Sequence, residues 1–219
     1  MRINRYVGRA LHIGRRKADD LVAKGKITVN GKVVKPGTTV HEKDIVHLDE
    51  RKLTLDQATQ TILLHKPTGY VCSRDGQGSK TIYDLLPEPY AGLQPVGRLD
   101  KDSSGLLILT NDGELAQQLS HPSYGKQKIY HVNLASPLKE ESERKLRRGV
   151  GLEDGKSQLE LSSLSADKKT WIVKIYEGRN RQIRRTFEAT GHTVVKLHRT
   201  RVGSYEIGDL KPGQFISAF

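Results

Sequence analysis

The sequence predicts an α+β fold, in which a small unit of two helices and a sheet precedes a larger unit with a mostly antiparallel mixed sheet. Three observations lead to this prediction. Residues 1–49 carry two segments with helical spacing and then short β-branched segments, residues 61–219 carry more strand than helix patterns, and residues 50–60 are polar. We therefore expect two domains, at residues 1–49 and 61–219, joined by a linker at residues 50–60.

The first unit begins with two predicted helices. Apolar residues recur at helical spacing between Ile3 and Leu11, and Gly14 ends that pattern. Residues 15–24 place apolar side chains on one helix face, and Gly25 is a suitable C-terminal capping position. The expected order is helix, turn, helix.

A small sheet is predicted to follow the helices. Asn30 and Gly31 lie between β-branched residues in the segment 27–34, which is the strongest short hairpin signal. Val40 and residues 45–48 are expected to form further short strands. The small sheet would give the helix pair a surface to pack against.

The charge of the chain points to a polyanionic partner. The sequence has 37 Lys and Arg against 25 Asp and Glu, a net charge of +12, which is typical of proteins that bind nucleic acid or an anionic membrane. No apolar run approaches a membrane span, and the basic, amphipathic start is not a signal peptide. Nucleic acid is therefore the favoured partner, and a basic surface that serves solubility alone is the alternative.

Basic side chains concentrate on the predicted helix pair. Five of them could line one face: Arg5, Arg9, Arg15, Arg16 and Lys17. Such a face would suit a phosphate backbone. The alternative is an ordinary solvated helix face.

Three segments of this unit occur in a specific order. They are Arg2-Ile-Asn-Arg-Tyr, Gly14-Arg-Arg-Lys-Ala-Asp-Asp-Leu-Val and Ile27-Thr-Val-Asn-Gly-Lys-Val-Val. The series resembles the S4 RNA-binding domain. The resemblance implies binding to structured RNA through its shape and phosphates rather than its base edges. A helix-turn-helix DNA-binding protein is a weaker alternative, because it leaves residues 60–219 unexplained.

The second unit opens with a strand, turn, strand pattern over residues 62–71, in which Lys-Pro-x-Gly forms the turn. Residues 81–86 are expected to form a helical turn and residues 106–109 a buried strand. Asp112 can cap a helix that begins at Glu114. The remaining expectations are strands at residues 129–134 and 171–176 and helices at residues 140–148 and 182–190.

Cysteine, histidine and carboxylate usage favours no metal site. Cys72 is the one cysteine of the sequence, which fits a reducing cytoplasm, and the eight histidines show no ligand spacing. Asp102 lies in a turn two residues after Asp100, and Asp112 fits a helix cap, so paired-carboxylate chemistry is not favoured. We expect no bound metal.

Asp100 is the candidate reactive carboxylate. It lies in a polar loop between Arg98 and Lys101, ahead of the predicted buried strand. Neighbouring positive charge keeps a carboxylate ionised, which a nucleophile or base requires. Spacing alone leaves open the alternative that Asp100 forms an ordinary surface ion pair.

A second basic cluster opens the last predicted helix. Helical spacing in Arg179-Asn-Arg-Gln-Ile-Arg-Arg places Arg181, Arg184 and Arg185 near one face. Guanidinium groups suit a phosphate or a carboxylate partner, and Arg181 is a candidate RNA contact. A solvated basic face is the alternative.

The second unit also carries a longer series of motifs. They are His65-Lys-Pro-Thr-Gly, Gly97-Arg-Leu-Asp-Lys-Asp-Ser-Ser-Gly-Leu-Leu-Ile-Leu-Thr-Asn-Asp-Gly, Lys128-Ile-Tyr-His-Val, the arginine cluster, Gly191-His192 and Leu197-His-Arg-Thr-Arg-Val-Gly. The series resembles the RsuA-type bacterial rRNA pseudouridine synthases, and with the S4-like unit the resemblance covers nearly the whole chain. Ser103 departs from the family's usual Thr but keeps the hydroxyl. A short C-terminal extension leaves substrate choice open.

The resemblance implies roles for five residues around a central cleft. Asp100 would be the catalytic aspartate, Arg184 would pair with its carboxylate, and Tyr130 would stack on the flipped uracil. Arg98 would help to extrude the target nucleotide, and Leu197 would pack beside the pocket. Without the motifs, Tyr130 and Leu197 would be taken as core residues. The alternatives for Arg98 and Arg184 are a surface cation and a helix charge.

The function implied is the isomerisation of a uridine to pseudouridine in ribosomal RNA, with the large subunit slightly preferred over the small. The reaction breaks the C1′–N1 bond and rejoins the ring through C5, so it requires no cofactor. The expected protein is a cytoplasmic monomer whose partner is ribosomal RNA or a pre-ribosomal particle. The alternative is a non-catalytic S4-type ribosome-assembly factor, against which the intact Gly97-Arg-Leu-Asp loop speaks.

Overall fold

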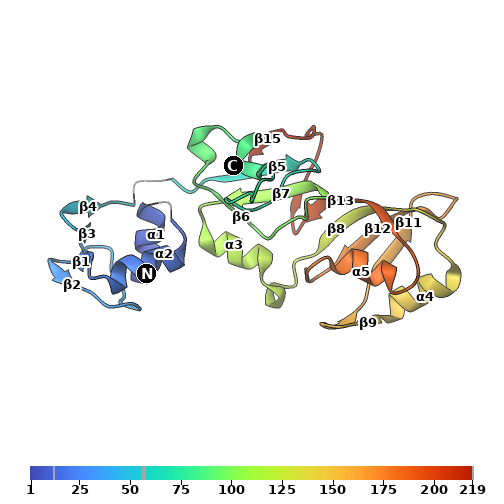
Figure 1. Cartoon of the computed structure of the whole chain (residues 1–219), viewed down its shortest axis with the longest axis horizontal. Coiled ribbons are helices and arrows are strands. Elements are labelled where there is room, and N and C mark those ends of the chain that lie inside the picture. Colours follow the sequence, from blue (N-terminus) through green and yellow to red (C-terminus); the bar gives the residue numbers. More distant parts are fainter. Residues whose placement is uncertain (12, 56–57, 219) are drawn as a thin grey trace. The chain divides into compact units, whose positions relative to one another are not determined.

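The computed structural model describes residues 1–11, 13–55 and 58–218, and Figure 1 labels its elements along the chain. By its internal contacts the chain divides into two compact units, Met1–Thr59 and Gln60–Phe219. None of the helices in the described ranges is long and apolar enough to cross a membrane.

The first unit has the predicted order of helix, turn, helix and small sheet. Helices α1 (Ile3–Ala10) and α2 (Arg15–Ala23) precede strands β1 (Ile27–Val29), β2 (Lys32–Val33), β3 (Val46–Leu48) and β4 (Arg51–Leu53). The strands form an antiparallel sheet in the order β2-β1-β3-β4. Its core consists of Ile3, Val7, Ala18, Val22, Ile27, Val40, Val46 and Leu53. One apolar stripe on each helix thus packs on one face of the sheet.

The hairpin predicted at Asn30-Gly31 is confirmed. Asn30 has φ 52° and Gly31 has φ 78°, so both central residues adopt the left-handed conformation that a two-residue hairpin turn of type I′ requires. Val40 does not form the strand expected of it. It lies next to an isolated bridge between Thr39 and Arg2, and its side chain fills the core instead.

The predicted linker begins too early. Arg51–Leu53 pairs with β3 as strand β4, and Leu53 is buried while Arg51 and Lys52 are exposed. This short strand lies at the edge of the sheet, and two of its three residues are charged. Composition alone therefore predicts a polar linker here, because the strand has only one apolar residue. Asp56 and Gln57, also assigned to the linker, lie outside the described residues.

The second unit is built on a nine-stranded sheet that is mostly antiparallel, as predicted. Seven strands run in the order β11 (Glu160–Ser163), β12 (Thr170–Ile175), β8 (Lys128–Leu134), β13 (Val194–Val202), β7 (Ser104–Thr110), β5 (Thr61–Lys66) and β15 (Phe215–Ser217). Strand β14 (Tyr205–Glu206) pairs with β13, and β6 (Gln94–Pro95) pairs with β7. β13 and β7 are parallel, which makes the sheet mixed.

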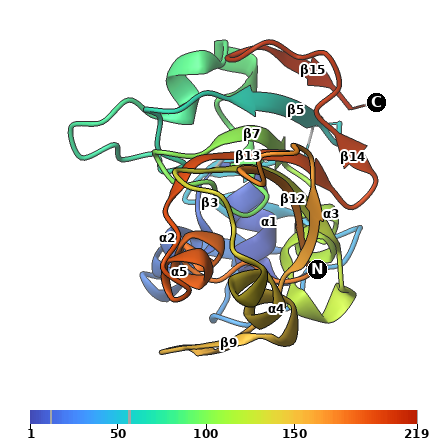
Figure 2. The same cartoon turned by 90° about the vertical axis from the view of Figure 1, so that its right-hand side faces the viewer.

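Helices cover both faces of this sheet (Figure 2). The helical segments are α3 (Gly113–Ser120), α4 (Glu140–Arg148), α5 (Gln182–Glu188) and the 3-10 helices η1 (Ile82–Leu85), η2 (Glu88–Tyr90) and η3 (Pro122–Tyr124). Alternation along β5 sends Leu63 toward α3 and Leu64 toward η1. A separate hairpin joins β9 (Val150–Leu152) to β10 (Gly155–Ser157).

Two local predictions in this unit have different outcomes. The Asp112 side chain accepts a hydrogen bond from the backbone N–H of Glu114 at 2.8 Å, which confirms the predicted cap of α3. The second strand expected after the Lys-Pro-x-Gly turn is reduced to an isolated bridge between Val71 and Thr81. The polar loop that follows offers that strand no further partner.

Candidate active site

A cleft of about 400 Å³ lies in the second unit, where the predicted catalytic loop meets β8, β13 and the start of α5. Its lining includes five residues that the sequence singled out: Arg98, Asp100, Tyr130, Arg181 and Leu197. Arg184 lies behind this lining, among the groups that hold it in place.

Lys66 anchors the loop that carries Asp100. Its side chain is fully buried, and its ammonium group donates hydrogen bonds to the carbonyl oxygens of Pro67 (3.0 Å), Asp100 (3.0 Å) and Ser103 (2.8 Å). Burial lowers the pKa of Lys66, whereas the carboxylates of Asp100 and Asp102 act in the opposite direction. This role was not predicted from the sequence, although a lysine soon after the apolar run of residues 62–64 is a usable signal.

Gly105 lets β7 and β13 come together behind the loop. Its φ is 112°, and an added Cβ atom would lie 2.2 Å from the carbonyl oxygen of Arg199. No side chain fits there, so the parallel contact between the two strands requires glycine. The close approach brings the Asp100 loop to the edge of β13.

Asp100 and Asp102 share the cations of α5, but not as predicted. The guanidinium of Arg181 lies 3.7 Å from the Asp100 carboxylate and donates two hydrogen bonds, of 3.1 and 3.0 Å, to Asp102. Arg184 lies 3.3 Å from the Asp102 carboxylate and donates to the Asp102 and Val194 carbonyl oxygens. The predicted pairing of Arg184 with Asp100 is therefore wrong in this structure, where Arg181 takes that place.

The reason lies in the backbone of Arg181. This residue has φ 45°, a left-handed conformation that is unusual for a side chain of its size, and it forms the N-cap of α5. The turn directs its side chain toward the Asp100 loop, a geometry that helical spacing does not predict. The hydrogen bonds from Arg181 hold the pKa of the Asp102 carboxyl below its usual value.

The other arginines of the cluster bind the hairpin β9–β10. Arg179 contacts Asp154 at 2.9 Å, and Arg185 contacts the same carboxylate at 2.6 Å. Inside the fold, the buried Gln182 amide donates to Ser157 and Glu177. The expectation that Arg185 shares a face with Arg181 and Arg184 is thus not met, because the Arg185 side chain forms an ion pair with Asp154 of the hairpin.

Tyr130 and Leu197 come from neighbouring strands of the sheet. Tyr130 on β8 is 6% exposed and lies opposite Arg199 of β13, while Leu197 lies opposite Val132. Residues two apart on a strand share a face, so Leu197 and Arg199 border the Tyr130 ring together. The cleft therefore combines an aromatic floor, a carboxylate and cations.

The basic residues of the first unit lie on its two helices. Arg15, Arg16 and Lys17 are exposed in the first turn of α2, and Arg5 and Arg9 are half-buried on α1. Cations at a helix N-terminus oppose the helix dipole, so local stability does not explain the three residues of α2.

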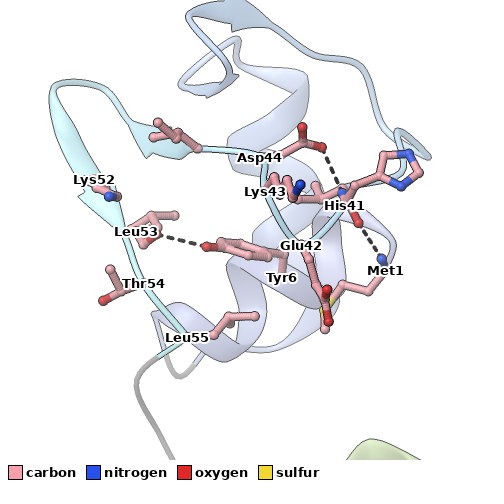
Figure 3. Close-up of a pocket in the computed structure, with 12 residues that line it drawn as sticks. Met1, Tyr6, His41, Glu42, Lys43, Asp44, Lys52, Leu53, Thr54 and Leu55 are labelled. Carbon is pink, nitrogen blue, oxygen red and sulfur yellow. Dashed lines mark hydrogen bonds between the residues drawn. The ribbon is translucent and has the colours of Figure 1, made fainter.

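The first unit also has a hollow of about 450 Å³, drawn in Figure 3. Its wall is held by a hydrogen bond from the Tyr6 hydroxyl to the Leu53 carbonyl oxygen and by one from the N-terminal amine to the Val40 carbonyl oxygen. Acidic and basic side chains alternate around it, so it has no clear charge preference. The hydrogen bond from Tyr6 to Leu53 ties β4 to α1 within this unit.

A basic helix pair in one unit and a carboxylate cleft in the other are the features expected of an enzyme that acts on RNA. Comparison with protein families agrees with this class: the RNA pseudouridylate synthase family matches residues 60–189, and the S4 domain matches residues 1–46. The chain belongs to the RNA pseudouridylate synthase family and carries an S4 domain at its N-terminal end.

Individual relatives cover almost the whole chain. Ribosomal large subunit pseudouridine synthase B of Bacillus subtilis is 40% identical over 97% of this chain and 89% of its own length. Ribosomal small subunit pseudouridine synthase A of Vibrio vulnificus is 34% identical over 98% of this chain and 94% of its own. A crystal structure of a pseudouridylate synthase matches with a TM-score of 0.73 and 30% identity, over 100% of this chain and 96% of that one.

Proposed function

We propose that this protein converts a uridine of ribosomal RNA to pseudouridine, with Asp100 as the catalytic carboxylate. The observation that carries the proposal is the convergence of Asp100, Tyr130 and Arg181 on one cleft in a chain of this family. The named relatives act on ribosomal RNA, which supports the same substrate class here.

The reaction requires a site that holds a detached base while it turns. The C1′–N1 bond breaks, the uracil rotates, and C5 bonds to C1′ while the C5 proton leaves and N1 gains a proton, so atoms and electrons balance without a cofactor. Arg181 lies 3.7 Å from the Asp100 carboxylate and places a cation beside the group that this chemistry uses. The Tyr130 ring would hold the uracil by stacking, an interaction worth about 1–3 kcal/mol.

A uridine in folded RNA must first leave its stack, at a cost of roughly a few kcal/mol. Arg98 is suited to occupy the space that the flipped uridine leaves in the RNA stack. It is exposed at the rim of the cleft, and no ion pair within the described ranges holds its side chain. A free guanidinium can stack on bases and bind phosphate at the same time.

The S4 domain would supply most of the RNA affinity. Arg15, Arg16 and Lys17 present three cations at the start of α2, where backbone N–H groups also point outward. Arg5 and Arg9 extend the basic surface along α1. Phosphate binding at this surface would position the RNA without reading its sequence.

The large ribosomal subunit is the proposed source of the target, because the Bacillus subtilis relative acts on it and is 40% identical. We further propose that the protein acts as a monomer in the cytoplasm. Ribosomes are assembled in this compartment, and a single cysteine stays reduced there. A non-catalytic assembly factor is disfavoured, because such a protein would not need a carboxylate, an aromatic ring and an arginine in one cleft.

The test compares ribosomal RNA from cells with and without the gene, by carbodiimide treatment and primer extension. We expect one pseudouridine stop to disappear on deletion and to return with the wild-type gene. The Asp100→Asn variant should bind RNA but fail to restore the stop. An unchanged set of stops in the deletion strain would refute the proposed activity, and a stop restored by Asp100→Asn would remove Asp100 from the mechanism.

A further inference from the structure

Arg199 is a buried arginine whose hydrogen-bonding capacity is only partly used. It lies on β13, is 3% exposed and lines the cleft. Its Nε atom donates a hydrogen bond of 2.8 Å to the Leu106 carbonyl oxygen, which fixes the plane of the guanidinium. One terminal nitrogen of Arg199 is fully buried and has no acceptor among the residues that the structure describes.

A buried N–H group without an acceptor is unfavourable, and more so when it carries charge. The other side chains that line the cleft do not offset the unfavourable energy of this unpaired N–H group. The cleft lining includes the cations Arg98, Lys128, Arg179, Arg181 and Arg199 but only the carboxylates Asp100 and Glu177. Burial lowers the pKa of Lys128, and the charge of Arg199 lowers it further. The lining of the cleft therefore carries an excess of positive charge, which suits an electron-rich ligand.

The position of Arg199 indicates which part of the RNA it meets. Arg199 and Tyr130 are direct partners in the antiparallel pair of β13 and β8, so their side chains leave the same face of the sheet about 5 Å apart. A uracil stacked on Tyr130 would present its edge to the neighbouring side chain. That edge carries the carbonyl oxygens O2 and O4, both hydrogen-bond acceptors.

We propose that the guanidinium of Arg199 donates a hydrogen bond from a terminal nitrogen to a carbonyl oxygen of the target uracil and stabilises the charge that this base gains during the reaction. The inference rests on the proposed function. When the C1′–N1 bond breaks, its electron pair leaves with the uracil, and the negative charge spreads over N1, O2 and O4. The charge disappears again when C5 bonds to C1′, and the loss of the C5 proton is then balanced by the gain of a proton at N1, so no further reactant is required.

A phosphate of the target nucleotide is the other anionic group within reach of such a site. Burial argues against it. Arg199 lies beside Leu197 and Tyr130 at the base of the cleft, whereas the exposed Arg98 lies at the rim. A flipped nucleotide enters base first while its phosphates stay with the RNA backbone, so the deepest cation meets the base.

The experiment combines Arg199→Gln with atomic changes in the RNA. Single-turnover rates are measured on a hairpin that carries the target uridine, and on the same hairpin with 2-thiouridine, 4-thiouridine or a 5′ methylphosphonate at that position. We expect Arg199→Gln to slow the reaction on the order of a hundredfold to a thousandfold, as for the loss of one preorganised donor to a developing anion. One of the two thio substitutions should slow the wild type but have little further effect in the variant.

Two outcomes would overturn the contact. The first is a thio effect of the same size in both proteins, and the second is coupling to the methylphosphonate alone, which would assign Arg199 to phosphate. A wild type that is inactive on the unmodified hairpin would instead refute the proposed function, so the two failures can be told apart.

Two controls test whether the loss of activity comes from misfolding of the variant. Thermal unfolding followed by the fluorescence of Trp171, the one tryptophan of the chain, shows whether Arg199→Gln keeps the fold of the second unit. Arg199→Lys preserves the charge and serves as the second variant. In addition, the side-chain ¹⁵N signals of Arg199 are followed in Asp100→Asn bound to the unmodified hairpin, where an unchanged terminal nitrogen signal would also contradict the proposal.

Discussion

Arg181 donates two hydrogen bonds to Asp102 while its guanidinium lies 3.7 Å from the carboxylate of Asp100. Asp102 therefore fixes the cation that lies beside the proposed catalytic group. Arg184 contacts Asp102 from the other side. The residue that the sequence analysis set aside as part of a turn is the centre of this arrangement.

Asp102→Asn should impair activity more than stability. The amide keeps the shape of the side chain but loses the charge that holds Arg181. Because the Asp102 side chain is 48% exposed, we expect less than about 1 kcal/mol of destabilisation, whereas the single-turnover rate should fall roughly tenfold with RNA affinity little changed. Urea unfolding and RNA-modification rates measure the two effects.

Glu140→Gln is the matched control for this variant. Glu140 also forms exposed ion pairs, with Arg144 and Lys168, but belongs to α4. Its replacement should leave the rate unchanged. Equal rates for Asp102→Asn and Glu140→Gln would show that Asp102 does not position Arg181.

Lys66→Met should destabilise the second unit and loosen the Asp100 loop. The substitution leaves the carbonyl oxygens of Pro67, Asp100 and Ser103 without their shared donor. We expect the free energy of unfolding to fall by about 2–4 kcal/mol, because three charge-assisted hydrogen bonds are lost while the cost of burying the ammonium is relieved. Urea unfolding followed by Trp171 fluorescence measures the change.

The exposed Lys139→Met serves as the control, since it removes a lysine without buried partners. It should change the free energy of unfolding by less than about 0.5 kcal/mol. A Lys66→Met protein as stable and active as this control would contradict the anchoring role of Lys66.

Local sequence signals predicted much of the fold. The Asn30-Gly31 turn, the Asp112 cap and the apolar strand β7 each have a short-range cause, so a single segment suffices to identify them. Strand β4 was not predicted because two exposed charged residues, Arg51 and Lys52, precede its one buried leucine. Its place in the sheet depends on β3 and α1, which is information that the segment does not contain.

The candidate site was predicted less completely, for a related reason. The order of motifs indicated which residues gather in the cleft, but their pairing depends on backbone geometry. The left-handed conformation of Arg181 directs it to the Asp100 loop, and Asp154 draws Arg185 away. Lys66 and Arg199 were missed because their roles follow from burial and from contacts across the sheet.

Acid should destabilise the second unit through His198. The ring packs against His65 with centroids 5.2 Å apart, and Nδ1 lies 2.9 Å from the Ser104 hydroxyl. Burial and then His65, with smaller contributions from Lys196 and His131, lower the pKa of His198 from 6.5 to about 4. Between pH 6.5 and about pH 4, His198 is protonated in the unfolded chain but not in the folded protein. The free energy of unfolding therefore falls as the pH decreases from about 6.5 to about 4.

His198→Gln should reduce this dependence. After allowance for partial solvent screening, we expect His198 to account for about 2 kcal/mol of the loss between pH 7 and pH 4.5. Urea unfolding of the wild type and of the variant at both pH values measures it, with His41→Gln, at an exposed histidine of the first unit, as the control. Parallel losses in all three proteins would exclude His198 as the source.

The basic start of α2 should control the salt dependence of RNA binding. Each phosphate contact that a protein neutralises contributes about 0.7–0.9 to the slope of log affinity against log salt. Replacing Arg15, Arg16 and Lys17 with Gln should therefore lower that slope by about 2 and weaken binding at low salt most strongly. The single-turnover rate at saturating protein should change little, because the cleft belongs to the second unit. The matched control removes three exposed cations of α4, Arg144, Lys145 and Arg148, of which the first two pair with Glu140 and Glu141, and it should leave the slope unchanged. If both sets of substitutions gave the same slope, net charge rather than the S4 surface would account for RNA binding.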